Sequence, residues 1–216
     1  MKSKLCLLTL GLFSLFLSAG AQSVESEGKD RVAKIYYTGD MQTSTVIKLV
    51  SVIDEINKNN NVDNIYLYIN SYGGDMDAGL MASAAIKSSK IPVTAIAMST
   101  VGSSATIMFC AAKDRRSLPD GSIYLHPAFT SHNGDLRPAD ITYLGKENKR
   151  FNEMFKKTYR ECTKLDENKI NDILNSEYNR ETFSPEKAIG AGLISKVDEK
   201  IVDANYNYYV TSKDDG

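Results

Sequence analysis

Residues 65–74 read Ile-Tyr-Leu-Tyr-Ile-Asn-Ser-Tyr-Gly-Gly, and this stretch decides the fold. Its first five residues are β-branched, aromatic or long apolar types, which favour a buried strand. Gly73-Gly74 follows directly, and an Ala/Met-rich helical pattern over residues 77–88 comes next. A strand that ends in a flexible turn and continues into a helix is the repeating unit of a parallel sheet.

The same unit recurs on both sides of this stretch. A strand is predicted at residues 32–37 and an amphipathic helix at 43–58, where apolar residues recur at helical spacing. Residues 93–98 form another predicted strand, which leads into a helix near Ser103, and residues 123–126 form a third short one. The pattern predicts a mostly parallel α/β sheet, in which functional groups gather where strands end and helices begin.

The C-terminal half is predominantly helical in pattern. Residues 138–165 are long, charged and helical, and a second helix is expected at 166–176. Ser184-Pro185 is a typical N-cap followed by a first-turn proline, which opens a short helix. Leu193-Ile194 begins a predicted final strand. The Lys/Glu-rich face at 146–161 reads as a solvated helix face, with a subunit contact as the alternative.

Residues 1–21 have the composition of a cleaved secretory signal. Lys2 and Lys4 precede an apolar run over residues 5–18, which is shorter than the roughly 20 residues of a spanning helix. Small residues at 19–21 suit signal peptidase, so Gln22 is the expected mature N-terminus and a periplasmic or secreted location follows. An uncleaved membrane anchor is the alternative.

Residues 22–31 are expected to be flexible, and residues 32–216 to form one domain. The whole chain has net charge −1, and removal of the two lysines of residues 1–21 leaves −3. This balance gives no indication of a nucleic-acid partner or an anionic membrane surface.

Two cysteines remain after signal removal, Cys110 and Cys162. Export would permit a disulfide between them. However, Cys110 lies in the apolar segment 107–112, which reads as a buried helix. We therefore expect two buried free thiols.

A serine, a histidine and a glycine turn together suggest acyl-transfer chemistry. Such chemistry needs a hydroxyl, a base that takes its proton, and backbone N–H groups aimed at the developing oxyanion. Ser103, His126 and Gly73-Gly74 can supply all three. Each alone is typical of something simpler: a helix N-cap, a structural histidine and a turn. Ser104 is a second candidate nucleophile, and His132, in a polar stretch, reads as a surface residue.

Five motifs, in order and at compatible spacings, resemble the Clp proteolytic subunit (ClpP-like) serine peptidases. They are Tyr-Ile-Asn-Ser-x-Gly-Gly at 68–74, Met-x-x-x-x-Ser at 98–103, Arg-x-x-Leu-Pro and a strand ending in His at 115–126, Asp-Ile at 140–141, and Ser-Pro-Glu-Lys-Ala-x-x-x-Gly-Leu-Ile at 184–194. The resemblance runs from about residue 32 to residue 197, which is nearly the whole mature chain.

The resemblance implies roles for individual residues. Ser103 would be the nucleophile and His126 the general base, and the N–H groups of Gly74 and Ser104 would form the oxyanion hole. No metal and no cofactor are implied. The implied fold is a ClpP/crotonase-like core of repeated ββα units with a long protruding helix. Family members assemble as stacked heptameric rings, which the long helix joins, and their usual partner is an ATP-driven unfoldase.

The chain departs from the family pattern at three points. Ser99 stands where the family usually has glycine, and Tyr72 where it has proline. The third triad member, an aspartate, has no counterpart before the Ser184-Pro185 helix. The best register puts Asn179 there, and Asn179 can orient a histidine but cannot stabilise its cation by charge. Glu177 or Glu181 could serve if the loop bends suitably.

These features predict an exported ClpP-like serine endopeptidase, acting on peptides or unfolded segments through a Ser-His acyl-enzyme mechanism. Export would separate it from a cytosolic unfoldase, so no ATP should be needed. Three alternatives stay open. The first is a catalytically silent, ring-forming scaffold. The second is a signal-peptide-peptidase-like enzyme with a Ser-Lys pair, for which Lys113 is the conceivable lysine. The third is an acyl-CoA enzyme of the crotonase superfamily.

Overall fold

The computed structural model describes residues 31–59 and 61–212. The predicted signal at 1–21 and nearly all of the segment 22–31 lie outside these residues. Eight strands form one sheet, in the order β6-β5-β3-β2-β1-β8. Off this path, β4 pairs with β3, and β7 pairs with β4. The strands are β1 (Val32–Thr38), β2 (Asn64–Ser71), β3 (Val93–Gly102), β4 (Asp114–Ser117), β5 (Ser122–Leu125), β6 (Glu181–Phe183), β7 (Lys196–Val197) and β8 (Tyr206–Thr211).

The α-helices in the described part of the chain begin and end close to the predicted limits. They are α1 (Thr43–Asn59), α2 (Met76–Ser88), α3 (Ser104–Cys110), α4 (Pro138–Cys162), α5 (Glu167–Asn175) and α6 (Pro185–Gly190). The single-turn 3-10 helix η1 (Glu177–Asn179) was not predicted. Ser184 caps α6, as expected, by accepting a hydrogen bond from the Lys187 backbone. The predicted α/β class and the long helix in the C-terminal half are confirmed.

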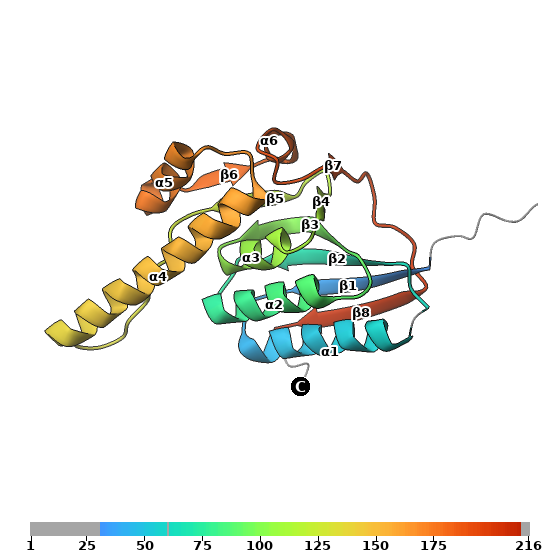
Figure 1. Ribbon diagram of the computed structural model, residues 1–216, viewed down its shortest axis with the longest axis horizontal. Helices are drawn as coiled ribbons and strands as arrows, with labels where there is room; N and C mark the ends of the chain where they lie inside the picture. Colours follow the sequence, from blue (N-terminus) through green and yellow to red (C-terminus); the bar gives the residue numbers. More distant parts are fainter. Residues whose placement is uncertain (1–30, 60, 213–216) are drawn as a thin grey trace, which may run out of the picture.

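Every strand pairing in the described sheet is parallel except that of β5 with β6. Helices α1, α2 and α3 lie side by side on one face of this sheet (Figure 1). The first five residues of β3 are buried on both faces, and four of these five residues are apolar, with Thr94 the exception. Gly79 of α2 lets the backbone of α3 approach closely, because a Cβ there would lie 2.8 Å from the Ser104 carbonyl oxygen.

The long strand β3 has two different neighbours on one side. Its first half pairs with β4 and its second half with β5, while β2 lies on its other side. The carboxyl ends of β2, β3 and β5 therefore meet at one edge of the sheet. Gly73-Gly74, Ser103 and His126 follow these three ends, so the topology alone brings them together.

Three strands, β4, β6 and β8, were not predicted from the sequence. The final strand predicted from Leu193 is instead β7, three residues further on. β8 adds to the edge of the sheet beside β1, with Ile35 opposite Tyr208. Apolar and polar residues alternate only weakly over residues 206–211, and the segment is largely exposed, so the sequence gives little indication of a strand. The segment is extended because it pairs with β1, which is distant in the sequence.

Helix α4 protrudes from the body of the molecule (Figure 1). Its buried residues, Phe155, Tyr159 and Cys162, all lie in its last two turns. In its first turns, Ile141 and Tyr143 are exposed. No helix of the described residues is long and apolar enough to cross a membrane.

A disulfide joins Cys110 to Cys162, so the expectation of two free thiols was wrong. The two cysteines end α3 and α4, and their Cα atoms lie 5.5 Å apart, within the range of disulfides. Cys110 is only half-buried, and α3 ends at this residue instead of continuing through Ala112. The two cysteines are 52 residues apart in the sequence, and only the tertiary fold brings the two helix ends together. The local sequence pattern around Cys110 therefore could not predict this contact.

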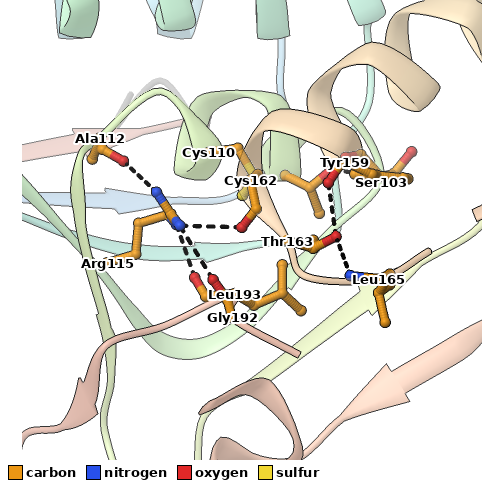
Figure 2. Close-up of a disulfide and its surroundings, with 11 residues drawn as sticks. Ser103, Cys110, Ala112, Arg115, Tyr159, Cys162, Thr163, Leu165, Gly192 and Leu193 are labelled. Carbon is orange, nitrogen blue, oxygen red and sulfur yellow. Dashed lines mark hydrogen bonds between the residues drawn. A yellow bond between two sulfur atoms is a disulfide. The ribbon is translucent and has the colours of Figure 1, made fainter. Parts of the chain in front are cut away.

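Hydrogen bonds reinforce this junction (Figure 2). Arg115 donates to the backbone oxygens of Ala112 (2.8 Å), Leu193 (2.8 Å) and Cys162 (3.1 Å). At the other end of α3, the Thr106 hydroxyl donates to the Ser103 carbonyl oxygen (2.6 Å) and lies 3.3 Å from the Tyr159 hydroxyl. Helix α3 is thus held to α4 at both of its ends.

Candidate active site

Ser103 stands at a strained turn between β3 and α3. Its φ of 53° and ψ of −134° make it the one described residue other than glycine with a positive φ. Such a conformation costs a β-carbon-bearing residue on the order of 1–3 kcal/mol, and it is concentrated at functional sites. The Ser103 side chain makes no capping hydrogen bond to α3, although it occupies the N-cap position. Its hydroxyl is therefore not committed to the helix.

The diglycine turn lies directly against Ser103. A Cβ on Gly73 would come within 2.5 Å of the Ser103 Cβ, and one on Gly74 within 2.6 Å of the Met41 carbonyl oxygen. The turn is held in place because the Met41 N–H donates to the Gly73 oxygen (2.9 Å) and the Asp75 N–H to the Met41 oxygen (2.8 Å). Glycine is required at both positions for reasons of space and of positive φ.

The backbone N–H groups of Gly74 and Ser104 have no acceptor among the described residues. Ser104 is the first residue of α3, and the first N–H groups of a helix have no partner within it. Pairs of such backbone N–H donors commonly form an oxyanion hole. Both predicted donors are thus available, from the turn after β2 and from the start of α3.

The Ser104 side chain is fully buried and faces α2, where its Cβ lies beneath Gly79. Its hydroxyl has no hydrogen-bond partner in the described structure. A nucleophile must reach the substrate, and this hydroxyl is enclosed between two helices. Of the two adjacent serines, only Ser103 can present its oxygen to a bound molecule.

His126 follows β5 and is only 3% exposed. Its Nδ1 lies 2.8 Å from Oε2 of Glu177. An ionised carboxylate only accepts hydrogen bonds, so this contact puts the hydrogen on Nδ1 and leaves Nε2 as an acceptor. Nε2 is buried and has no partner in the described part of the chain. The imidazole is thus in the tautomer that a general base needs.

The carboxylate that meets His126 is Glu177, and Asn179 does not contact it. The Asn179 amide donates to the backbone and side-chain oxygens of Asp172, both at 2.9 Å. Glu181 forms an ion pair with Lys169. The preferred placement of Asn179 beside the histidine was therefore wrong, because the turn η1 directs its first residue, Glu177, toward His126 and its last toward α5. Glu177 is one of the two glutamates named as alternatives if the loop bends suitably, and the turn η1 supplies that bend.

Ser103 and His126 face a common cleft of about 1050 Å³. Between these two side chains the described structure gives no hydrogen bond, which is common in ligand-free sites that tighten on binding substrate. Aromatic and amide side chains make up much of the cleft wall. They include Tyr72, Phe129, Asn148, Asn152 and Asn175.

The remaining candidate residues lie elsewhere. Lys113 follows α3 and lines a separate pocket of about 400 Å³ at the amino ends of β3 and β4. The carboxyl end of β3, where Ser103 stands, is at the opposite edge of the sheet, so a Ser103-Lys113 pair is not formed. His132 is exposed in the loop before α4. Across residues 31–59 and 61–212, no cluster of His, Cys, Asp and Glu could hold a metal ion.

Tyr124 is a site residue that the sequence analysis missed. Its hydroxyl donates to the Tyr72 carbonyl oxygen (2.6 Å), immediately before the diglycine turn. Its ring occupies the space beside Gly102, where a Cβ would lie 1.9 Å from ring carbons. Burial raises the pKa of the Tyr124 phenol, so it remains a donor. The sequence feature that pointed to Tyr124 is its position two residues before His126, and in the sheet it pairs with Gly102.

Comparison with known proteins agrees with this geometry. The model of the Clp protease family matches residues 26–200. An ATP-dependent Clp protease proteolytic subunit 2 from Treponema denticola is 32% identical over 136 residues, which cover 62% of this chain and 65% of that protein. The alignment thus spans just under two thirds of that relative's length.

A second relative aligns over more of both chains. It is an ATP-dependent Clp protease proteolytic subunit from Deinococcus radiodurans, 25% identical over 171 residues, which cover 78% of this chain and 80% of the relative. Among solved structures, a ClpP1 mutant from Listeria monocytogenes superimposes with a TM-score of 0.68. That match has 21% sequence identity and covers 77% of this chain and 91% of the other, so it shows a shared fold.

Proposed function

Because this chain belongs to the Clp protease family, whose members are in general serine peptidases that form oligomeric rings and act on peptides, we propose that it is a serine endopeptidase. Its substrates would be short peptides or unfolded segments that can enter the cleft in an extended form. The proposed catalytic groups are Ser103, His126 and Glu177, with the N–H groups of Gly74 and Ser104 as the oxyanion hole.

In the proposed mechanism, Glu177 holds the hydrogen on Nδ1 of His126, and Nε2 takes the proton of the Ser103 hydroxyl. The Ser103 oxygen attacks the scissile carbonyl carbon, and the resulting oxyanion accepts hydrogen bonds from the N–H groups of Gly74 and Ser104. His126 then gives its proton to the leaving amine, and an acyl-enzyme remains. Water, deprotonated by His126, releases the acyl group and restores the serine.

The single observation that carries this proposal is the Glu177–His126 contact. It gives His126 a charged partner where the family's aspartate is missing. It also leaves Nε2 without a hydrogen-bond partner, in a side chain that lines the same cleft as Ser103. In a serine protease, a carboxylate in this role stabilises the imidazolium, and its replacement by an amide costs about 10⁴ in kcat.

The test is fluorophosphonate labelling followed by peptide mapping. We expect the label on Ser103 and its loss in Ser103→Ala. Ser104→Ala should keep measurable labelling, because Ser104 contributes only its backbone N–H. Labelling of another residue would contradict the proposal. A wild-type protein that neither takes the label nor cleaves peptides would favour the silent scaffold.

We further propose that the protein is exported, and that it cleaves peptides without ATP. The signal-like composition of residues 1–21 supports export, and so does the Cys110–Cys162 disulfide, because disulfides persist in oxidising compartments. N-terminal mass spectrometry of the protein from its native cells should find Gln22 as the first residue. An intact Met1 in a soluble cytosolic pool would contradict this.

A further inference from the structure

Glu177 is an unusual partner for a buried histidine because its own side chain is 56% exposed. It stands at the start of the single turn η1, and it is one methylene longer than the aspartate that the family pattern places near here. A longer, solvent-exposed side chain loses more rotamer freedom when one conformation is held. One hydrogen bond to His126 leaves the other carboxylate oxygen, Oε1, without that restraint.

Arg180 supplies a second contact to this carboxylate. Its Nη1 lies 3.6 Å from Oε1 of Glu177, while Oε2 faces Nδ1 of His126. The two oxygens of one carboxylate therefore meet two different partners. Arg180 comes directly after η1, so the turn itself sets the spacing between the two side chains.

The Arg180 guanidinium is in turn held by an aromatic ring. Its central carbon lies 3.8 Å from the centroid of Tyr124, in the range of a cation–π contact. Tyr124 is almost fully buried, and its hydroxyl is fixed on the Tyr72 carbonyl oxygen. The ring is therefore held in place, and a guanidinium that lies over it has a defined position.

From these contacts we infer that Arg180 is a positioning residue for Glu177, held over the Tyr124 ring so that the exposed glutamate keeps its carboxylate on His126. The inference rests on the proposed function of Ser103, His126 and Glu177. Arg180 acts through Glu177 and takes no part in proton transfer. The chain of contacts runs from Tyr124 to Arg180, to Glu177 and to His126.

A double-mutant cycle with a peptide ester substrate tests this. Arg180→Met keeps much of the apolar stem and removes the guanidinium. In the wild-type background it should lower kcat by about tenfold with KM changed less than about twofold. In the Glu177→Gln background the same change should cost less than about twofold, because the charge that Arg180 holds is already gone. Arg160→Met, which breaks a comparably exposed ion pair with Glu167 away from the cleft, is the matched control and should leave kcat unchanged.

A second readout does not depend on catalysis. The chain has two histidines, so the low-field proton resonance of the His126 Nδ1–H can be assigned with a His132→Gln variant. We expect this resonance in the wild type and in Arg160→Met, weakened by exchange in Arg180→Met, and absent in Glu177→Gln. If the proposed function is wrong, the wild-type protein will be inactive. In that case the Nδ1–H resonance still shows whether Arg180 holds Glu177 on His126.

Two results would overturn the inference. One is an equal loss of kcat on Arg180→Met in both backgrounds, which would mean that Arg180 acts independently of Glu177. The other is an Nδ1–H resonance in Arg180→Met as sharp as in the wild type.

Discussion

Removal of the Cys110–Cys162 disulfide should lower the free energy of unfolding by about 4 kcal/mol. The bridge closes a loop of 52 residues. In the chain-entropy model, a loop of this length lowers the entropy of the unfolded chain by about 14 cal/mol/K, which is about 4 kcal/mol at 25 °C. That is a large fraction of the about 5–15 kcal/mol that stabilises a typical domain.

The assay is urea unfolding followed by far-ultraviolet circular dichroism, since the chain has no tryptophan. The chain beginning at Gln22 is used so that Cys6 is excluded, and the protein concentration is held fixed because assembly would add stability. With an m-value of about 2 kcal/mol/M, the midpoint of the Cys110→Ala/Cys162→Ala variant should fall by about 2 M. A reductant should bring the wild type to a similar midpoint and leave the variant unaffected.

The outcome that would refute this reasoning is a wild type whose midpoint is the same with and without reductant and equal to that of the variant. Alkylation of the unfolded, unreduced protein provides the matching chemical check. It should modify neither cysteine in the wild type, and modification of both would show that the thiols are free.

Three further predictions concern the site. Asn179→Asp should change kcat/KM less than about twofold, because the Asn179 side chain hydrogen-bonds Asp172 and does not contact His126. Glu177→Gln should lower kcat by at least about a hundredfold, and steady-state kinetics with a peptide ester show which of the two residues supports His126. Tyr124→Phe should lower the free energy of unfolding by about 1–3 kcal/mol, since it leaves the Tyr72 carbonyl oxygen without its donor, and a shift in the urea midpoint measures this. Gly102→Ala should cost about 1–3 kcal/mol through overlap with the Tyr124 ring and should lower the melting temperature; an unchanged melting temperature would contradict the packing argument.

Much of the fold follows from the sequence because its signals are local. Residues 65–69 and 93–97 are rich in apolar and aromatic side chains, which is typical of buried strands in a parallel sheet, and the glycine turn and Ser103 follow these two strands. Periodicity gave the helices within a few residues. The candidate nucleophile, base and oxyanion donors come from motifs at strand ends, where sheet topology leaves little freedom.

Tertiary structure decided the features that join distant segments. Cys110 meets Cys162 only because α3 and α4 end at the same place, and β8 is a strand only because β1 offers it an edge. The third group of the site depended on a single 3-10 turn, which rotates Glu177 toward His126 and Asn179 away from it. The sequence determines local conformation because helix, strand and turn preferences depend on residues that are neighbours in the chain. The direction of one side chain in a short turn depends instead on the distant residues that pack around it.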